Sequence, residues 1–145
     1  MNKKQIENYL QEGLNCSQTV LMYFHKRYDL SEKTASKIAQ PFESGLFRGE
    51  TCGAVSGADM VLGLEYGSHE ENSRRIMKEK IEEYNKSFKE KMGTLQCEDR
   101  RDLSKGNNRL NRNTRRDDRI RERDLPFIME EIKDRDPYLL QIICI

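Results

Sequence analysis

Several features that would point to common protein classes are missing from this chain. It contains no Trp and only two His, and its formal net charge is +1. A charge this small gives no bulk reason to expect a nucleic acid or an anionic membrane as a partner. No run approaches the roughly 18 apolar residues that would span a bilayer, and residues 1–7 lack the apolar stretch of a secretory signal. We therefore expect a cytoplasmic protein without a membrane span.

The four cysteines do not form a Cys-x-x-Cys pair, so neither a thioredoxin-type motif nor a zinc-ribbon signature is present. Permanent disulfides are rare in the cytoplasm. We therefore expect Cys16, Cys52, Cys97 and Cys144 to be thiols, metal or cluster ligands, or a transient redox pair. No histidine cluster accompanies them, so any bound metal would be held by thiolates alone.

The balance of residues divides the chain into three predicted parts. At 35% hydrophobic and 35% charged residues, with a mean hydropathy of -0.92, the chain is too polar to pack entirely into one core. We predict a helical cysteine-containing domain over residues 1–97, a charged flexible segment over 98–124, and a helical or irregular segment over 125–145. The middle part is rich in Arg, but its interspersed acids and lack of aromatics favour a solvated segment over an RNA-binding one.

Helical periodicity dominates the first 97 residues, and no strand pattern competes with it. We predict an all-α fold, a small bundle of four to five helices. Asn15 and Gln18 form a capping box before one helix, and Ser68 with Glu71 is expected to form another before a long charged helix ending near Gly93. The apolar stretch of Met60, Val61, Leu62 and Leu64 predicts a central helix buried on most faces, which Gly63, Tyr66 and Gly67 should break. The helices are expected over about residues 3–14, 16–28, 31–40, 52–64 and 68–92.

Cys52 lies in the segment Thr51-Cys52-Gly53-Ala54-Val55-Ser56-Gly57-Ala58, where a glycine-spaced loop should become a helix. A thiol in the first turn of a helix faces unpaired N–H groups and the positive end of the helix dipole, which favour thiolate over thiol. The small neighbours let a second sulfur, a cofactor or another backbone approach closely. Close helix packing and cofactor approach both explain these neighbours.

Two other cysteines are expected near Cys52, because Cys16 also opens a helix and Cys97 follows the end of a third. In a thiol-exchange mechanism, Cys52 would be the nucleophile and Cys16 the resolving partner. In a metal-binding mechanism, Cys16, Cys52 and Cys97 would ligate a metal ion or an iron–sulfur cluster, with Cys144 a weaker fourth candidate. Gly53 would then give room for the inorganic core as part of the cofactor-binding set. The residues leave both mechanisms open.

A different class of function also fits the chain. Cysteines are often buried as inert small hydrophobes, and a non-catalytic helical interaction module would use the basic tail or an apolar helix face to bind a partner. His25 and His69 are expected at the surface and are not assigned as bases. A redox partner protein accompanies the first hypothesis, and a small core would gain burial from a second copy of the chain in a homodimer.

Three cysteine contexts together resemble a known family. Cys16 stands in Asn-Cys-Ser-Gln-Thr-Val-Leu, Cys52 stands in Cys-Gly-Ala-Val-Ser-Gly before Ala-Asp-Met-Val-Leu-Gly-Leu, and Cys97 follows Gly93. These motifs resemble the C-GCAxxG-C-C family of bacterial proteins regarded as redox-active, which are helical and similar to the cysteine-bearing part of split-Soret cytochromes. The resemblance covers about residues 3–97. In the family the fourth cysteine follows the third closely, whereas Cys144 lies beyond the Arg-rich stretch, so the resemblance does not carry that role to Cys144.

Overall fold

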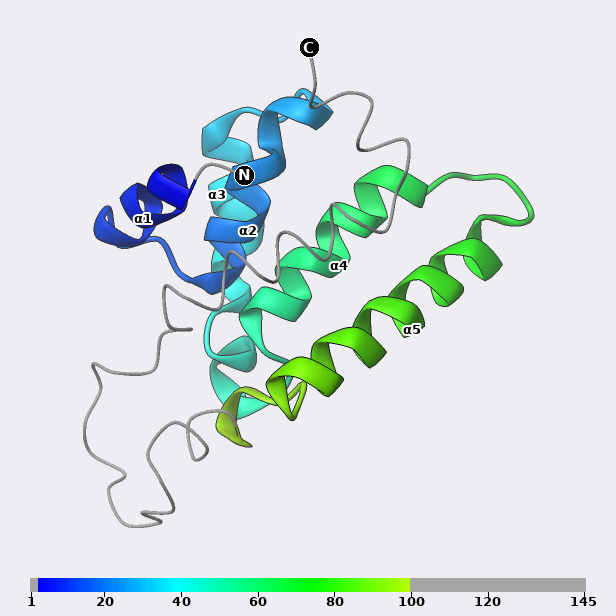
Figure 1. The fold of residues 1–145 in the computed structure, drawn as a ribbon. Coiled ribbons are helices and arrows are strands. Elements are labelled where there is room, and N and C mark those ends of the chain that lie inside the picture. The colour runs from blue at the N-terminus through cyan, green and yellow to red at the C-terminus, as the bar shows by residue number, and fades with distance from the viewer. Residues whose placement is uncertain (1–2, 100–145) are drawn as a thin grey trace.

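The computed structural model describes residues 3–99, and this part of the chain is helical (Figure 1). The predicted all-α fold is confirmed. Among the described residues the only strand-like pairing is an isolated antiparallel bridge between Thr51 and Gln96. The elements in chain order are α1 (Lys3–Gln11), α2 (Cys16–Phe24), the short 3-10 helix η1 (His25–Tyr28), α3 (Glu32–Ala39), the 3-10 turn η2 (Gln40–Phe42), the π-helical turn η3 (Gly45–Gly49), α4 (Gly53–Tyr66) and α5 (Ser73–Met92).

Most of the two predicted segments over 98–124 and 125–145 falls outside the described residues, and so does Cys144. The exceptions are Glu98 and Asp99, which continue a helical turn that begins at Cys97. No helix in the described part is both long enough and apolar enough to cross a membrane.

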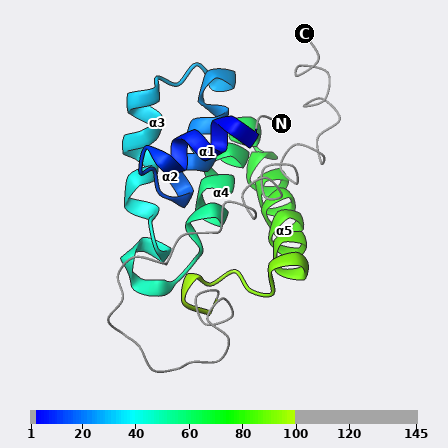
Figure 2. The same ribbon diagram turned by 60° about the vertical axis from the view of Figure 1, so that its left-hand side comes forward.

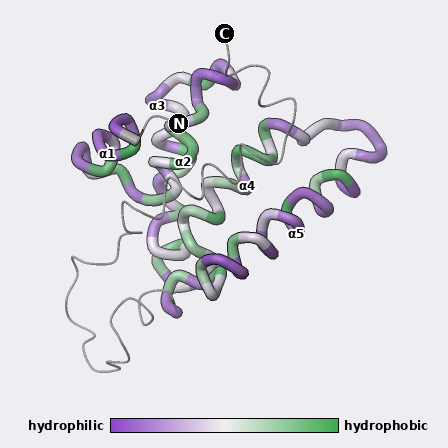
Figure 3. The backbone as a smooth tube through the Cα atoms, viewed as in Figure 1, coloured by the Kyte–Doolittle hydropathy of each residue, from purple (hydrophilic) through white to green (hydrophobic). Residues whose placement is uncertain are grey.

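The middle of the bundle is occupied by α2 and α4, which pack against each other. α3 and α1 lie against α2, and α5 lies along α4, so α4 separates α2 from α5 (Figures 1 and 2). The tube of α4 is mostly apolar or neutral, whereas the connection from α4 to α5 is hydrophilic (Figure 3). The largest fully buried side chains come from α1, α2, α4 and α5 and include Ile6, Val20, Leu21, Val55, Val61 and Phe88.

The central position predicted for the helix around Met60 is confirmed, and most of the first half of α4 is buried. Val61 and Leu62 are buried in α4, whereas Leu64 is 39% exposed. The reason is that Leu64 lies in the last turn of α4, where the chain leaves the bundle toward the hydrophilic connection.

The two ends of the α4–α5 connection agree only in part with the prediction. α4 ends at Tyr66 with Gly67 as its C-cap, as expected, but Gly63 does not break the helix, because the Gly63 carbonyl accepts the N–H of Gly67 at 2.9 Å. One interior glycine costs a helix only about 1 kcal/mol relative to alanine. The capping box expected at Ser68 is also absent: α5 begins at Ser73, whose side-chain oxygen accepts the N–H of Ser68 at 2.9 Å.

A left-handed turn precedes α4, where a simple loop was expected. Ser44, Gly45, Leu46 and Phe47 have consecutive φ values of 50°, 63°, 59° and 59°. The left-handed region costs a residue with a side chain about 1–2 kcal/mol. Three of these four residues carry side chains, so this segment is held in place by the structure around it.

Candidate functional site

Each cysteine of the described part lies where a helix begins. Cys16 is the first residue of α2, and the oxygen of the Asn15 side chain caps this helix by accepting the N–H of Gln18 at 2.9 Å. The side chain of Gln18 returns the bond to the N–H of Asn15 at 3.0 Å, which confirms the predicted capping box. Cys52 is the residue that precedes α4, and Cys97 opens the helical turn after Gln96.

Glycine at position 53 allows the first turns of α2 and α4 to meet. A Cβ atom at Gly53 would lie 3.3 Å from the Cβ of Cys16, 3.4 Å from the backbone nitrogen of Ser17 and 2.9 Å from the carbonyl oxygen of Phe42. Because Gly53 is bonded to Cys52, this contact brings the backbone of Cys52 beside Cys16. The structure therefore places the starts of these two helices together, as the sequence suggested.

Cys97 joins the same region through backbone pairing. The N–H of Cys52 donates to the carbonyl of Leu95 at 2.8 Å, and the N–H of Cys97 donates to the carbonyl of Glu50 at 2.6 Å. These bonds flank the bridge between Thr51 and Gln96. In an antiparallel register, residues one step to either side of a pair share a face. Cys52 and Cys97 therefore occupy diagonal positions on one face of this short pairing.

The three cysteines differ in their access to solvent. Cys16 is half-buried, whereas Cys52 is 2% exposed and Cys97 is 8% exposed. A reagent or partner that approaches the folded protein therefore reaches Cys16 first.

A second close contact explains the other glycine of the Cys-Gly-Ala-x-x-Gly segment. A Cβ atom at Gly57 would lie 2.9 Å from the Cβ of Val20 and 3.0 Å from the carbonyl oxygen of Ser17. Both glycines thus face α2 at successive turns of α4, and their missing side chains let the two helices approach closely. Close packing accounts for the spacing of the two glycines, and this packing draws the starts of the two helices together.

A ligand set for a metal is not formed within residues 3–99, where no group of three or more Cys, His, Asp or Glu side chains is arranged to hold a metal ion. The donors that the described chain offers therefore do not fit a cluster held by Cys16, Cys52 and Cys97 together. We derive no chemical step through a metal or iron–sulfur centre.

The histidines lie away from the cysteines. His25, expected at the surface, is instead buried at 4% exposure, because it follows the buried helix α2 directly and its Nδ1 lies within hydrogen-bonding distance of the Met22 carbonyl. Its Nε2 is 3.7 Å from a carboxylate oxygen of Glu32. Nine helical residues separate the start of α2 from His25, a rise of about 13 Å, so His25 is not a base for Cys16. His69 is exposed, as predicted.

Two polar groups in the bundle were not anticipated from the sequence. Asp59 stands in the apolar middle of α4, and burial raises the pKa of its carboxyl to about 6. At the far end of α4, Glu65 accepts hydrogen bonds from Tyr28 at 2.6 Å and from Arg27 at 3.0 Å. The sequence signal that could have identified both groups is that Asp59 and Glu65 are acidic residues within an otherwise apolar helix. Neither group is near the helix starts that carry the cysteines.

Comparison with known proteins agrees with this arrangement. Residues 14–123 match the family described as "Putative redox-active protein (C_GCAxxG_C_C)". The chain belongs to this C-GCAxxG-C-C family. The family match includes Cys16, Cys52 and Cys97 and ends before Cys144. It also corrects the expected limits, since it begins after α1 and continues past Cys97 into the Arg-rich stretch. Searches of curated proteins and of solved structures found no match.

Proposed function

We propose that this member of the C-GCAxxG-C-C family is a thiol–disulfide redox protein in which Cys16 and Cys52 form and break a disulfide. The observation that supports this most directly is the contact of the Cys16 Cβ with the position that a side chain at Gly53 would fill, 3.3 Å away. It joins the starts of two helices that are far apart in sequence. Cys97 would be a third thiol beside this pair.

The electrostatic setting suits sulfur anions. Both Cys16 and Cys52 stand at helix N-termini, where the helix dipole stabilises negative charge. At the start of α2 an oxygen of Asn15 accepts a first-turn N–H. At the start of α4 the corresponding position holds a sulfur, which is a much weaker acceptor than oxygen. The side chain of Cys52 makes no capping hydrogen bond to α4, so its place at the positive end of the helix dipole is what supports the proposal at this position.

The exposures favour an order of reaction opposite to the one expected from the sequence. Cys16, which is half-buried, is the better candidate to attack a partner, and Cys52, at 2% exposure, the better candidate to resolve the mixed disulfide. In this order the Cys16 thiolate attacks one sulfur of a partner disulfide and releases the partner's first thiolate. The Cys52 thiolate then attacks the Cys16 sulfur and releases the second thiolate. The partner gains two electrons, and the protein gains one disulfide.

One observation favours a second candidate function, the helical interaction module. Phe47 is 68% exposed and Ile38 is 50% exposed, so each offers an apolar side chain to a partner. In this alternative the cysteines are inert. Both candidate functions are compatible with a cytoplasmic protein and with the homodimer considered from the sequence.

The test is to map the disulfide. The purified full-length protein is oxidised with diamide, which accepts two electrons and two protons, then digested without reductant at low pH and analysed by mass spectrometry. We expect a peptide pair linking Cys16 to Cys52. Cys97→Ser is the matched control and should keep this link, whereas Cys16→Ser should lose it.

Three results would overturn the proposal. Folded protein that gives no link between Cys16 and Cys52 at any diamide concentration would support inert cysteines. A disulfide found only between Cys52 and Cys97 would mean that the redox pair lies beside the β-bridge of Thr51 and Gln96 and does not include Cys16. Stoichiometric iron or zinc in anaerobically purified protein, lost in Cys52→Ser, would support the metal-binding mechanism instead.

A further inference from the structure

The left-handed turn before Cys52 holds three of the four non-glycine residues that have positive φ in the described chain. Ser44, Gly45, Leu46 and Phe47 all have positive φ, and Gly49 follows with a φ of 77°. Gly45 also has no space for a side chain, because its Cβ would lie 2.5 Å from the backbone nitrogen of Glu50. Backbone strain of this kind persists only where the surrounding contacts hold it.

Two hydrogen bonds in series connect this turn to Cys97. The carbonyl of Gly45 accepts the N–H of Glu50 at 3.3 Å, and the carbonyl of Glu50 accepts the N–H of Cys97 at 2.6 Å. Gly49 lies against the next residue after Cys97, since its Cβ position is 3.1 Å from side-chain atoms of Glu98. A change in the turn therefore displaces the residue that holds the backbone of Cys97.

The other end of the same segment rests on the Cys52 region. The carbonyl oxygen of Phe42 is 2.9 Å from the Cβ position of Gly53. Residues 43–50 thus connect two points of contact, one beside Cys52 and one on Cys97, and both cysteines are buried.

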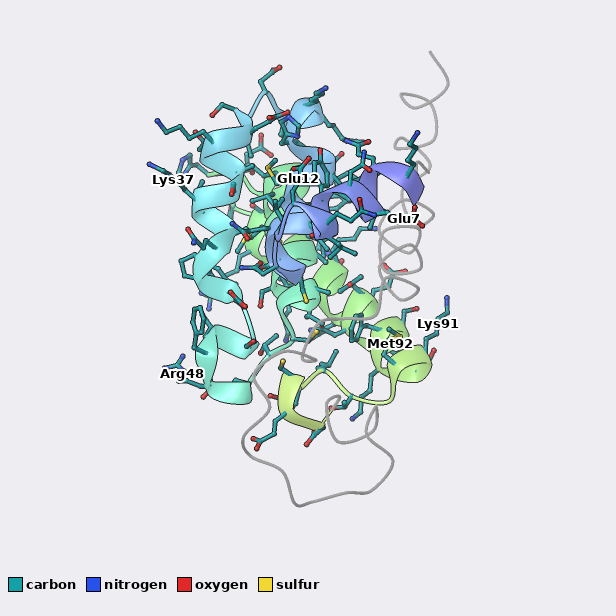
Figure 4. The ribbon with its side chains drawn as sticks, turned by 90° about the vertical axis from the view of Figure 1, so that its left-hand side faces the viewer. Glu7, Glu12, Lys37, Arg48, Lys91 and Met92 are labelled. Atoms are coloured by element: carbon teal, nitrogen blue, oxygen red, sulfur yellow. The ribbon has the colours of Figure 1, made fainter. Side chains whose placement is uncertain are left out.

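Little packing holds the outer side of the turn. Phe47 is 68% exposed, and Arg48, which pairs with Glu50 at 3.3 Å, points away from the bundle (Figure 4). A strained backbone whose largest side chain is in solvent opens more easily than the helices around it.

We propose that residues 43–50 are a gate over the buried cysteines: when the left-handed turn relaxes, Glu50 releases Cys97 and the thiols of Cys97 and Cys52 become accessible. Its biological role rests on the proposed redox function, because the gate would decide when thiols other than Cys16 react with a partner. The opening itself does not depend on that function.

The test is the rate of alkylation of the folded, full-length protein by iodoacetamide, measured for each cysteine by peptide mass spectrometry. Phe47→Gly removes the left-handed strain with little loss of packing, and Phe47→Ala removes the same ring but keeps the strain. We expect Cys97 and Cys52 to react about fivefold more slowly in Phe47→Gly than in Phe47→Ala, because glycine stabilises the closed turn. Cys16 should react equally in both variants.

A further variant is expected to change the alkylation rate in the opposite direction. Gly45→Ala places a Cβ against the backbone of Glu50 and should speed the alkylation of Cys97. Equal rates for Cys97 in Phe47→Gly and Phe47→Ala would overturn the gate, and so would slower labelling of all three cysteines alike, which would indicate a general change in stability. If the alkylation rates confirm the gate but no disulfide forms between Cys16 and Cys52, the gate is retained and the proposed redox function is rejected.

Discussion

The glycines in and after the Cys52 segment differ in how closely other parts of the chain approach them. At Gly53 and Gly57 the space of a side chain is filled by α2 or by the carbonyl of Phe42, whereas at Gly63, in the same helix, nothing lies within 4 Å of the Cβ position. The sequence could identify the small residues but could not distinguish these cases, because the neighbours come from residues 16–20 and 42. Contacts between distant parts of the chain decide which glycine is replaceable.

This difference predicts opposite effects of the same substitution. Gly57→Ala should destabilise the fold by about 1–3 kcal/mol, because the new methyl group meets the backbone of Ser17 and cannot be accommodated by a side-chain rotation. Gly63→Ala should stabilise it by up to about 1 kcal/mol, because alanine is the better helix former and the site is open. Urea unfolding followed by far-UV circular dichroism measures both values. Equal effects of the two substitutions would show that α2 and α4 are not packed this closely.

The residues that begin α2 also bond this helix to the end of α3. The amide of Asn15 donates to the carbonyl of Gln40 at 3.1 Å, and the hydroxyl of Ser17 donates to the carbonyl of Ala39 at 2.8 Å. The start of α2 is therefore bonded to the end of α3 as well as capped. Ser31 caps α3 through a single N–H, that of Thr34, and is exposed.

The two caps should therefore differ in their contribution to stability. We expect Ser31→Ala to lower the free energy of unfolding by about 1 kcal/mol, the usual value for an exposed cap. Asn15→Ala should lower it by about 2 kcal/mol or more, because it also removes the part-buried bond to the Gln40 carbonyl and the buried oxygen that accepts the hydroxyl of Ser17. Since Cys16 is the next residue, Asn15→Ala should also speed its alkylation. Equal losses in urea unfolding would mean that the link to Gln40 contributes nothing.

The sequence predicted helices well where local signals decide them. The caps at Asn15 and Ser31 and the stop at Gly93 are confirmed, because each depends on residues within one turn. The predicted start of α5 was wrong: the helix begins at Ser73 after Asn72, with no side-chain cap, because the connection folds back so that the N–H of Ser68 donates to the side chain of Ser73. The left-handed turn could not be predicted either, since Leu46 and Phe47 disfavour that conformation locally and only tertiary contacts maintain it.

The path of the chain is what assembles the candidate site. The starts of α2 and α4 meet because α3 and the left-handed turn return the chain to the start of α2, and the segment of Cys97 pairs with that of Cys52 because α5 runs back along α4 (Figure 2). The family motif identified Cys16, Cys52 and Cys97 as candidate site residues, and the glycine spacing indicated close packing. The relative exposure of the cysteines, on which the proposed order of attack rests, follows only from the complete fold.

A disulfide between Cys16 and Cys52 would close a loop that contains α2, α3 and the turn, so it should affect the stability of the entire bundle. By the entropy of the unfolded chain, a loop of this size stabilises the folded state by about 3–4 kcal/mol. We expect diamide-oxidised protein to unfold at a higher urea concentration than reduced protein. Cys97→Ser should keep this difference and Cys16→Ser should abolish it. If the disulfide is mapped but oxidised and reduced protein have the same urea midpoint, the bond does not stabilise the fold. The strain that it places on the contact between the first turns of α2 and α4 would then cancel the stabilisation that it gives by restricting the unfolded chain.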